Sequence, residues 1–190
     1  MTNISGHTFD ETIIRDTPVI LDLGCNKGDF ARGILKMFPR ATVISFEPTK
    51  GLTEIDSENW TIVNKAIVGG NQEKIKFNQC SNEKSFESSI LFKHPTAEEI
   101  EVDCQNLNDL ISQFRYIDLV KVDIEGAEYE AIESMEEKNI AIPRQWSIEF
   151  HDFMDSSLKD KSASIIRKIL RKGFKTKYID DSLMDVNFIS

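Results

Sequence analysis

The chain has 190 residues, 40% hydrophobic and 29% charged, with a net charge of −9. This length fits one domain with its own core, and the acidity argues against a nucleic-acid partner held through phosphate contacts. No apolar run is long enough to span a membrane, and the N-terminus lacks the pattern of a signal peptide. Cys25, Cys80 and Cys104 lack metal-type spacing and are typical of reduced thiols, so we expect a cytoplasmic protein.

The first third of the chain alternates between strand and helix patterns. The apolar run Val19–Leu23 is typical of a strand buried in a parallel sheet. Apolar residues from Gly28 to Phe38 recur at helical spacing, and Pro39 ends that pattern. Residues 41–48 and 60–68 form two further apolar runs, each of which predicts one strand.

The middle of the chain is more polar and rich in turn residues. Residues 69–104 contain two alternating segments, "KIKFNQC" and "EEIEVDC", which predict two strands around a mobile loop, Ser81 to Ser89. We expect this loop, with Phe86, Ser88 and Ser89, to fold over a bound molecule. A solvated polar loop has the same composition, so that alternative stays open.

The rest of the chain repeats the alternation. Residues 117–126 and 144–153 read as core strands, a helix rich in isoleucine ends at Gly173, and two short runs after it form a closing antiparallel pair. This order predicts a single α/β domain over residues 1–190, a doubly wound three-layer sandwich in which 1–18 is a short N-terminal extension.

Ligands of such sheets bind at the carboxyl ends of the strands, where the strand order reverses. That rule selects four short segments for the site. They are Asp22 to Gly28, Glu47 to Thr49, Asp123 to Gly126, and Glu149 to Asp152.

The loop after the first strand reads D-x-G-x-N-x-G, with Asp22, Gly24, Asn26 and Gly28 at its fixed positions. Glycines let the backbone turn and pass close to a ligand, and the next helix directs free N–H groups toward the loop. An acid at this place disfavours a pyrophosphate and suits a cation such as S-adenosylmethionine. Glu47 ends the second strand, where a carboxylate can accept hydrogen bonds from ribose hydroxyls.

Two other function classes fit parts of this pattern. An NAD-dependent oxidoreductase explains the fold and Glu47, but it explains neither the missing third glycine nor Asp22. A non-catalytic nucleotide-binding module would keep the fold and lose motif residues, whereas the motifs here are intact. In the plainest alternative the glycines only shape a turn and the two acids lie on the surface.

Four stretches together resemble the FkbM-type methyltransferases, a branch of the class I S-adenosylmethionine-dependent enzymes. The resemblance runs from about Val19 to Phe153, in three ordered motifs: D-x-G-x-N-x-G, F-E-P and D-x-E-G-x-E. The matching stretches are "LDLGCNKGDF", "FEP", "NKAIVGG" and "VKVDIEGAEYEAI". The resemblance implies a Rossmann-like fold whose sheet has seven strands, mostly parallel, with an antiparallel C-terminal hairpin strand. It also implies methyl transfer, usually to a hydroxyl of a sugar or another polyhydroxylated small molecule.

Cofactor residues are expected at the ends of the first four strands. The third strand end, around Ala66, is where class I enzymes usually contact adenine. The candidate S-adenosylmethionine-binding residues are Asp22, Gly24, Asn26, Gly28, Glu47, Pro48, Ala66 and Asp123.

The candidate catalytic residues follow the fourth and fifth core strands. We expect His151 or Asp123 to take the acceptor proton, while Glu125 and Glu149 orient the acceptor hydroxyls. Two plainer roles stay open: Glu125 could cap the following helix, and His151 could be an ordinary hydrogen-bonded residue at a strand end. The segment that faces the acceptor matches no consensus, so the acceptor stays open.

Two features are left to interpret: the remaining histidines and the possibility of a metal site. His7 and His94 have no nearby motif and are interpreted as surface residues. The four candidate catalytic side chains could hold magnesium or manganese, but their pattern is not diagnostic. No metal ligand is therefore assigned, and a metal is not favoured.

Overall fold

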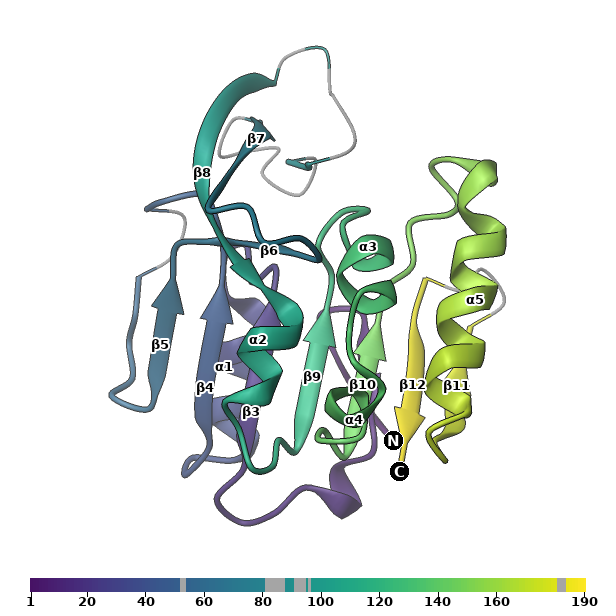
Figure 1. Ribbon diagram of the computed structural model, residues 1–190. Coiled ribbons are helices and arrows are strands. Elements are labelled where there is room, and N and C mark those ends of the chain that lie inside the picture. The colour runs from purple at the N-terminus through teal and green to yellow at the C-terminus, as the bar shows by residue number, and fades with distance from the viewer. Residues whose placement is uncertain (52–53, 81–87, 91–94, 96, 181–183) are drawn as a thin grey trace.

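A seven-stranded mixed sheet forms the centre of the computed structural model, which describes residues 1–51, 54–80, 88–90, 95, 97–180 and 184–190 (Figure 1). Its strand order is β11-β12-β10-β9-β3-β4-β5. In chain order the strands are β3 (Val19–Leu23), β4 (Thr42–Phe46), β5 (Trp60–Val63), β9 (Leu119–Val122), β10 (Gln145–Ile148), β11 (Lys175–Ile179) and β12 (Val186–Ile189).

The pairing places the carboxyl ends of five strands along one edge of the sheet. β3 pairs in parallel with β4 on one side and with β9 on the other, and β5 and β10 extend these two halves in parallel. β12 is antiparallel to both β10 and β11. The chain therefore leaves β3 in one direction and later returns to its other side, which makes the β3–β9 boundary the switch point at which ligands bind.

Helices cover both faces of this sheet, as in a Rossmann-like fold. Figure 1 shows α1 behind the sheet and the other four helices in front of it. α1 turns its apolar side, with Phe30 and Ile34, into the core. The helices are α1 (Asp29–Met37), α2 (Leu107–Ser112), α3 (Glu128–Glu133), α4 (Glu137–Ile140) and α5 (Lys159–Leu170), with short 3₁₀ turns η1 (Glu11–Ile13) and η3 (Ser156–Leu158).

A second sheet stands above the carboxyl edge of the first, in the order β6-β8-β7 (Figure 1). It consists of β6 (Ala66–Val68), β7 (Lys74–Gln79) and β8 (Glu98–Asn106). The expected pair of strands around a loop is confirmed, because β7 and β8 pair antiparallel. Of the expected loop, Ser81 to Ser89, only Ser88 and Ser89 lie within the described residues.

The prediction of one strand over residues 60–68 is wrong. The chain turns after β5, where the Asn64 side-chain amide donates to the Glu47 carbonyl at 3.1 Å and the Lys65 N–H donates to the Val63 carbonyl at 2.9 Å. β6 then pairs with β8 in the second sheet. An apolar run shows burial, but it does not show to which sheet each part belongs.

The N-terminal residues fold as a hairpin of β1 (Thr2–Ile4) and β2 (His7–Phe9). Its two turn residues both have positive φ, as a tight hairpin requires. The Thr8 N–H donates to both carboxylate oxygens of Asp185, at 3.0 and 3.1 Å, and β2 lies beside β10 and β12. The expectation that His7 lies on the surface is therefore wrong, since its side chain is only 2% exposed.

None of the helices in the described part of the chain combines the length and the apolar character that crossing a membrane requires.

Candidate active site

The loop after β3 is fixed by its neighbours on both sides. The N–H groups of Gly24 and Cys25 both donate to the Phe46 carbonyl at the end of β4. Gly24 has a φ of +80°, and a Cβ built on it would lie 1.8 Å from the Asp123 carbonyl oxygen. The side of this glycine where a Cβ would lie is thus filled by the backbone at the end of β9. Asn26 also has a positive φ, of 46°.

Glu47 connects the loop to the end of β4. One carboxylate oxygen accepts from the Asn26 N–H at 3.0 Å, and the other accepts from the Thr49 N–H at 2.9 Å. The side chain is largely buried, and this burial raises the pKa of Glu47 despite both backbone hydrogen bonds. Each oxygen keeps a free lone pair for one further donor.

A cavity that is open to solvent lies between this loop and the second sheet. We call it the Glu47 cavity. It brings together six of the eight candidate cofactor residues, and Ser88 also lines it. The six are Gly24, Asn26, Glu47, Pro48, Ala66 and Asp123.

The other two candidates lie beside the cavity. Asp22 is fully buried beneath the loop, where it accepts a hydrogen bond from the Ser45 hydroxyl at 3.1 Å and lies 3.2 Å from the Lys121 ammonium. Gly28 is the N-cap of α1 and has a left-handed φ of +80°. Neither residue lines the Glu47 cavity.

Lys121 is a functional candidate that the sequence reasoning missed. Its ammonium donates to the Gly24 carbonyl at 2.6 Å and lies 3.5 Å from Asp123. Burial alone would lower the pKa of Lys121, but the Asp22 and Asp123 carboxylates outweigh that effect and raise it. The signal in the sequence was a lysine within the apolar run "LVKV", which needs a buried counter-charge.

Four side chains converge beyond the ends of β9 and β10: Asp123, Glu125, Glu149 and His151. We call them the strand-end cluster. The Nε2 atom of His151 lies 3.3 Å from Glu125, 3.7 Å from Asp123 and 3.9 Å from Glu149. The sequence placed all four at one edge of the sheet, and the structure brings them within contact of one imidazole.

Glu128 holds that imidazole from the other side. It is fully buried; its Oε1 lies 3.0 Å from His151 Nδ1 and accepts from the His151 backbone N–H at 3.1 Å. Its Oε2 accepts from the Gly126 N–H at 2.8 Å. The last acid of the D-x-E-G-x-E motif therefore positions His151. Glu125 makes no capping hydrogen bond to α3, so that alternative is not observed.

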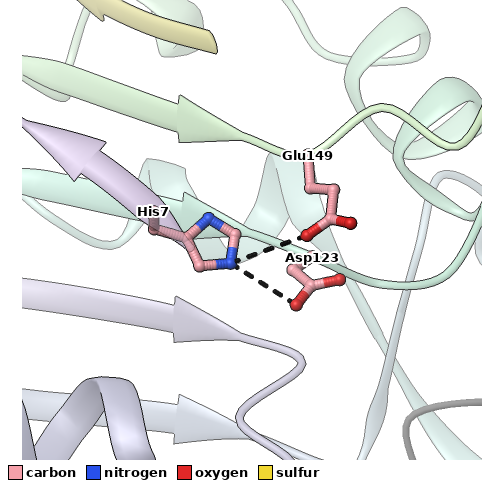
Figure 2. Close-up of side chains that lie close together, drawn as sticks. All are labelled: His7, Asp123 and Glu149. Atoms are coloured by element: carbon pink, nitrogen blue, oxygen red, sulfur yellow. Dashed lines mark hydrogen bonds and ion pairs between the residues drawn. The ribbon is translucent and has the colours of Figure 1, made fainter. Parts of the chain in front are cut away.

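His7 reaches the same cluster from the N-terminal hairpin. Figure 2 shows its Nε2 atom pointing at Asp123 and Glu149, at 3.4 and 4.0 Å. His7, Lys121 and Asp123 also line a second opening, the His7 cavity, which shares Gly24, Asn26 and Asp123 with the Glu47 cavity. The two cavities thus meet along the glycine loop.

The charges of the cluster shift one another. Burial would lower the pKa of His151, but Glu125 and Glu128 outweigh it and raise the pKa to about 11. Burial and the Asp123 charge raise the pKa of Glu149 to about 7, and burial raises that of Glu125. Burial alone would raise the pKa of Asp123, but Lys121 and His7 outweigh this effect and lower it.

Comparisons with known proteins agree on the kind of enzyme. The family model described as the methyltransferase FkbM domain matches residues 22–176. The methyltransferase sdnD of Sordaria araneosa is 23% identical over 85% of this chain and 79% of its own length. The 2-O-methyltransferase NoeI of Sinorhizobium fredii is 27% identical over 60% of this chain and 56% of its own length.

Solved structures agree on the fold. Methyltransferase FkbM from Methylobacillus flagellatus superposes with a TM-score of 0.56 and 14% identity, over 95% of this chain and 46% of that one. A precorrin-6y C5,15-methyltransferase from Geobacter metallireducens superposes with a TM-score of 0.50 and 10% identity. The match covers 93% of this chain and 83% of that one. The chain spans about half the length of NoeI and of the FkbM structure. Because the family model covers most of the chain, the chain belongs to the FkbM methyltransferase family.

Proposed function

We propose that this methyltransferase transfers the methyl group of S-adenosylmethionine to a hydroxyl oxygen of a sugar or another polyhydroxylated small molecule. The observation that carries the proposal is the position of Asp123. This residue lines the Glu47 cavity and also belongs to the strand-end cluster. A cofactor cavity and an acceptor site would then share one wall.

The Glu47 cavity fits the nucleoside part of this cofactor. Glu47 offers two carboxylate lone pairs for the ribose hydroxyls, and Pro48 and Ala66 supply apolar wall beside it for adenine. The His7 cavity adjoins it along the loop and contains Lys27, a cation suited to the cofactor's amino-acid carboxylate. The bound cofactor supplies an activated methyl group on a positively charged sulfur.

The strand-end cluster fits an acceptor rich in hydroxyls. Carboxylates accept hydrogen bonds from hydroxyls, and methyl transfer requires the acceptor oxygen to be held in line with the bond that breaks. Glu125 and Glu149 would orient the acceptor. Of the two candidate bases, His151 is held protonated by its carboxylate partners. Asp123 is the one that can accept the hydroxyl proton, but Lys121 and His7 lower its pKa and so weaken it as a base.

Among the relatives, NoeI supports an oxygen acceptor, because its name specifies 2-O-methyl transfer. The identity of 27% and the partial coverage make this support for a class of acceptor rather than for one compound. The family result leaves the oxidoreductase alternative without support.

A transfer assay tests the proposal. The protein would be incubated with methyl-labelled S-adenosylmethionine and a panel of monosaccharides, oligosaccharides and polyol metabolites. We expect label in at least one hydroxyl acceptor, and a loss of at least about 100-fold in the Asp123→Asn variant, the range typical of general-base removal. A folded protein that binds the cofactor but labels no panel member would instead be a binding module.

A further inference from the structure

The His151 imidazole is oriented by the buried carboxylate of Glu128. Glu128 is fully buried and lies 3.0 Å from His151 Nδ1. Nδ1 faces Glu128, and Nε2 on the other side of the ring lies near Glu125 and Asp123. A carboxylate behind one ring nitrogen is the usual support of a histidine that binds a metal through the other.

The atoms in front of Nε2 have the spacing of a metal site. Two ligand atoms bound to one ion at about 2.1 Å lie about 3.0 to 3.4 Å apart. Nε2 lies 3.3 Å from Glu125 Oε2 and 3.7 Å from Asp123 Oδ1. One ligand atom from each of the three residues lies within 4.8 Å of the others, so small side-chain rotations suffice to close the set.

Charge and access also suit a cation. Three carboxylates, from Asp123, Glu125 and Glu149, converge on the His151 imidazole, and the Lys121 ammonium lies 3.5 Å from Asp123. A divalent cation would add positive charge where three carboxylates meet. Their side chains are 25%, 24% and 22% exposed, so an ion can enter from solvent and keep open coordination positions.

We propose that Asp123, Glu125 and His151 bind one divalent transition-metal ion, which in turn binds two neighbouring hydroxyls of the acceptor. The mixed nitrogen and oxygen ligands favour Mn²⁺, Fe²⁺, Co²⁺ or Zn²⁺ over Mg²⁺ and Ca²⁺. A bound ion would replace the proton on Nε2 and would lower the pKa of a coordinated hydroxyl. The binding of acceptor hydroxyls and the lowered hydroxyl pKa both rest on the proposed function, whereas the binding of the ion does not.

A second candidate set, His7 with Asp123 and Glu149, shares Asp123 with the first. Its imidazole lacks the same support, because no hydrogen-bond partner for His7 Nδ1 exists among the described residues. This difference assigns the ion to the His151 side.

The test is a titration of chelator-treated, desalted protein with Mn²⁺ alone, followed by calorimetry and by electron paramagnetic resonance. We expect one equivalent to bind, and at least about tenfold weaker binding in His151→Ala and in Glu125→Gln. The matched control is Glu133→Gln, which removes an exposed carboxylate on α3 and should leave binding unchanged. Circular dichroism checks that each variant folds.

Several results would overturn the proposal. They are the absence of stoichiometric binding to folded wild-type protein, unchanged affinity in both His151→Ala and Glu125→Gln, and loss in His7→Ala with retention in His151→Ala. If His151→Ala does not fold, the partly exposed Glu125 carries the test alone. The binding of S-adenosylhomocysteine, measured with and without chelator, separates the two proposals. If the protein binds S-adenosylhomocysteine but does not bind Mn²⁺, only the metal site is contradicted.

Discussion

Gly24 packs tightly against the end of β9. Its φ of +80° suits glycine, and the Asp123 carbonyl occupies the place where a Cβ would lie. The same contact holds the glycine loop against the strand end that carries the cluster. A side chain here would therefore separate the loop from β9 as well as strain it.

Substitution of this glycine can be compared with one that has the same backbone conformation and free space. Gly51 has a φ of +75°, and among the described residues, its chain neighbours apart, nothing lies within 4 Å of the place that a Cβ would take. We expect Gly51→Ala to lower the free energy of unfolding by about 1 kcal/mol, the cost of left-handed backbone alone. Gly24→Ala should lower it by about 2–4 kcal/mol, because a steric clash is added. Urea unfolding measures both, and equal losses would contradict the close contact with Asp123.

Single residues were predictable where their role depends on strand ends. Asp123, Glu125, Glu149 and His151 follow apolar runs at fixed offsets, so their convergence could be foreseen. His7 could not be found in this way, because its partner Asp123 is 116 positions away and no periodic pattern surrounds it. Contacts of that kind depend on how a hairpin packs rather than on local spacing.

At the scale of elements, one ion pair joins the segment before β3 to the start of β9. The Arg15 guanidinium donates to both carboxylate oxygens of Asp118, at 2.8 and 2.6 Å, and the Val19 N–H donates to the same carboxylate at 2.9 Å. Asp118 is 1% exposed. This carboxylate therefore fixes the entry of the chain into the sheet.

We expect Asp118→Asn to lower the free energy of unfolding by about 2–4 kcal/mol, because it leaves a charge and buried donors without their full partner. Urea unfolding at pH 7 checks this value. Asp103→Asn, which changes an exposed carboxylate on β8, is the matched control and should stay within about 0.5 kcal/mol.

The same variant carries a pH dependence with a defined sign. Burial alone would raise the pKa of Asp118, but the Arg15 and Val19 hydrogen bonds outweigh it and lower the pKa. The ion pair therefore contributes fully to the free energy of unfolding when the pH is above the pKa of Asp118 in the unfolded chain, about 3.9. This contribution is lost as the pH falls through the lower pKa of Asp118 in the folded protein. The difference in free energy of unfolding between wild type and Asp118→Asn should shrink below about pH 4. A difference that stays constant with pH would contradict the lowered pKa of Asp118.

Elements were predictable as far as burial and period determine them. The alternation of strand and helix that forms the central sheet could be read from apolar spacing, and so could the β7–β8 pair. The division of residues 60–68 into β5 and β6 could not, because both parts are apolar and only the hydrogen bonds at Asn64 and Lys65 turn the chain. The hairpin of β1 and β2 is too short for periodicity to reveal.

At the scale of the whole molecule, the fold places two cavities on either side of one loop. The Glu47 cavity and the His7 cavity share Gly24, Asn26 and Asp123, and this boundary coincides with the reversal of strand order between β3 and β9. The topology alone could predict this location. The acceptor could not be predicted, because its specificity depends on side chains that no general packing rule determines.

The most direct test of the account is isothermal titration calorimetry of the protein with S-adenosylmethionine, S-adenosylhomocysteine and NAD⁺. We expect binding of the first two and none of NAD⁺. Glu47→Gln should bind about 10–100-fold more weakly, a loss of about 1.4–2.8 kcal/mol, whereas Glu58→Gln, at an exposed carboxylate, should bind as wild type does. The absence of binding of both sulfur cofactors to folded protein, or equal affinity in Glu47→Gln, would contradict the assignment of this cavity to S-adenosylmethionine.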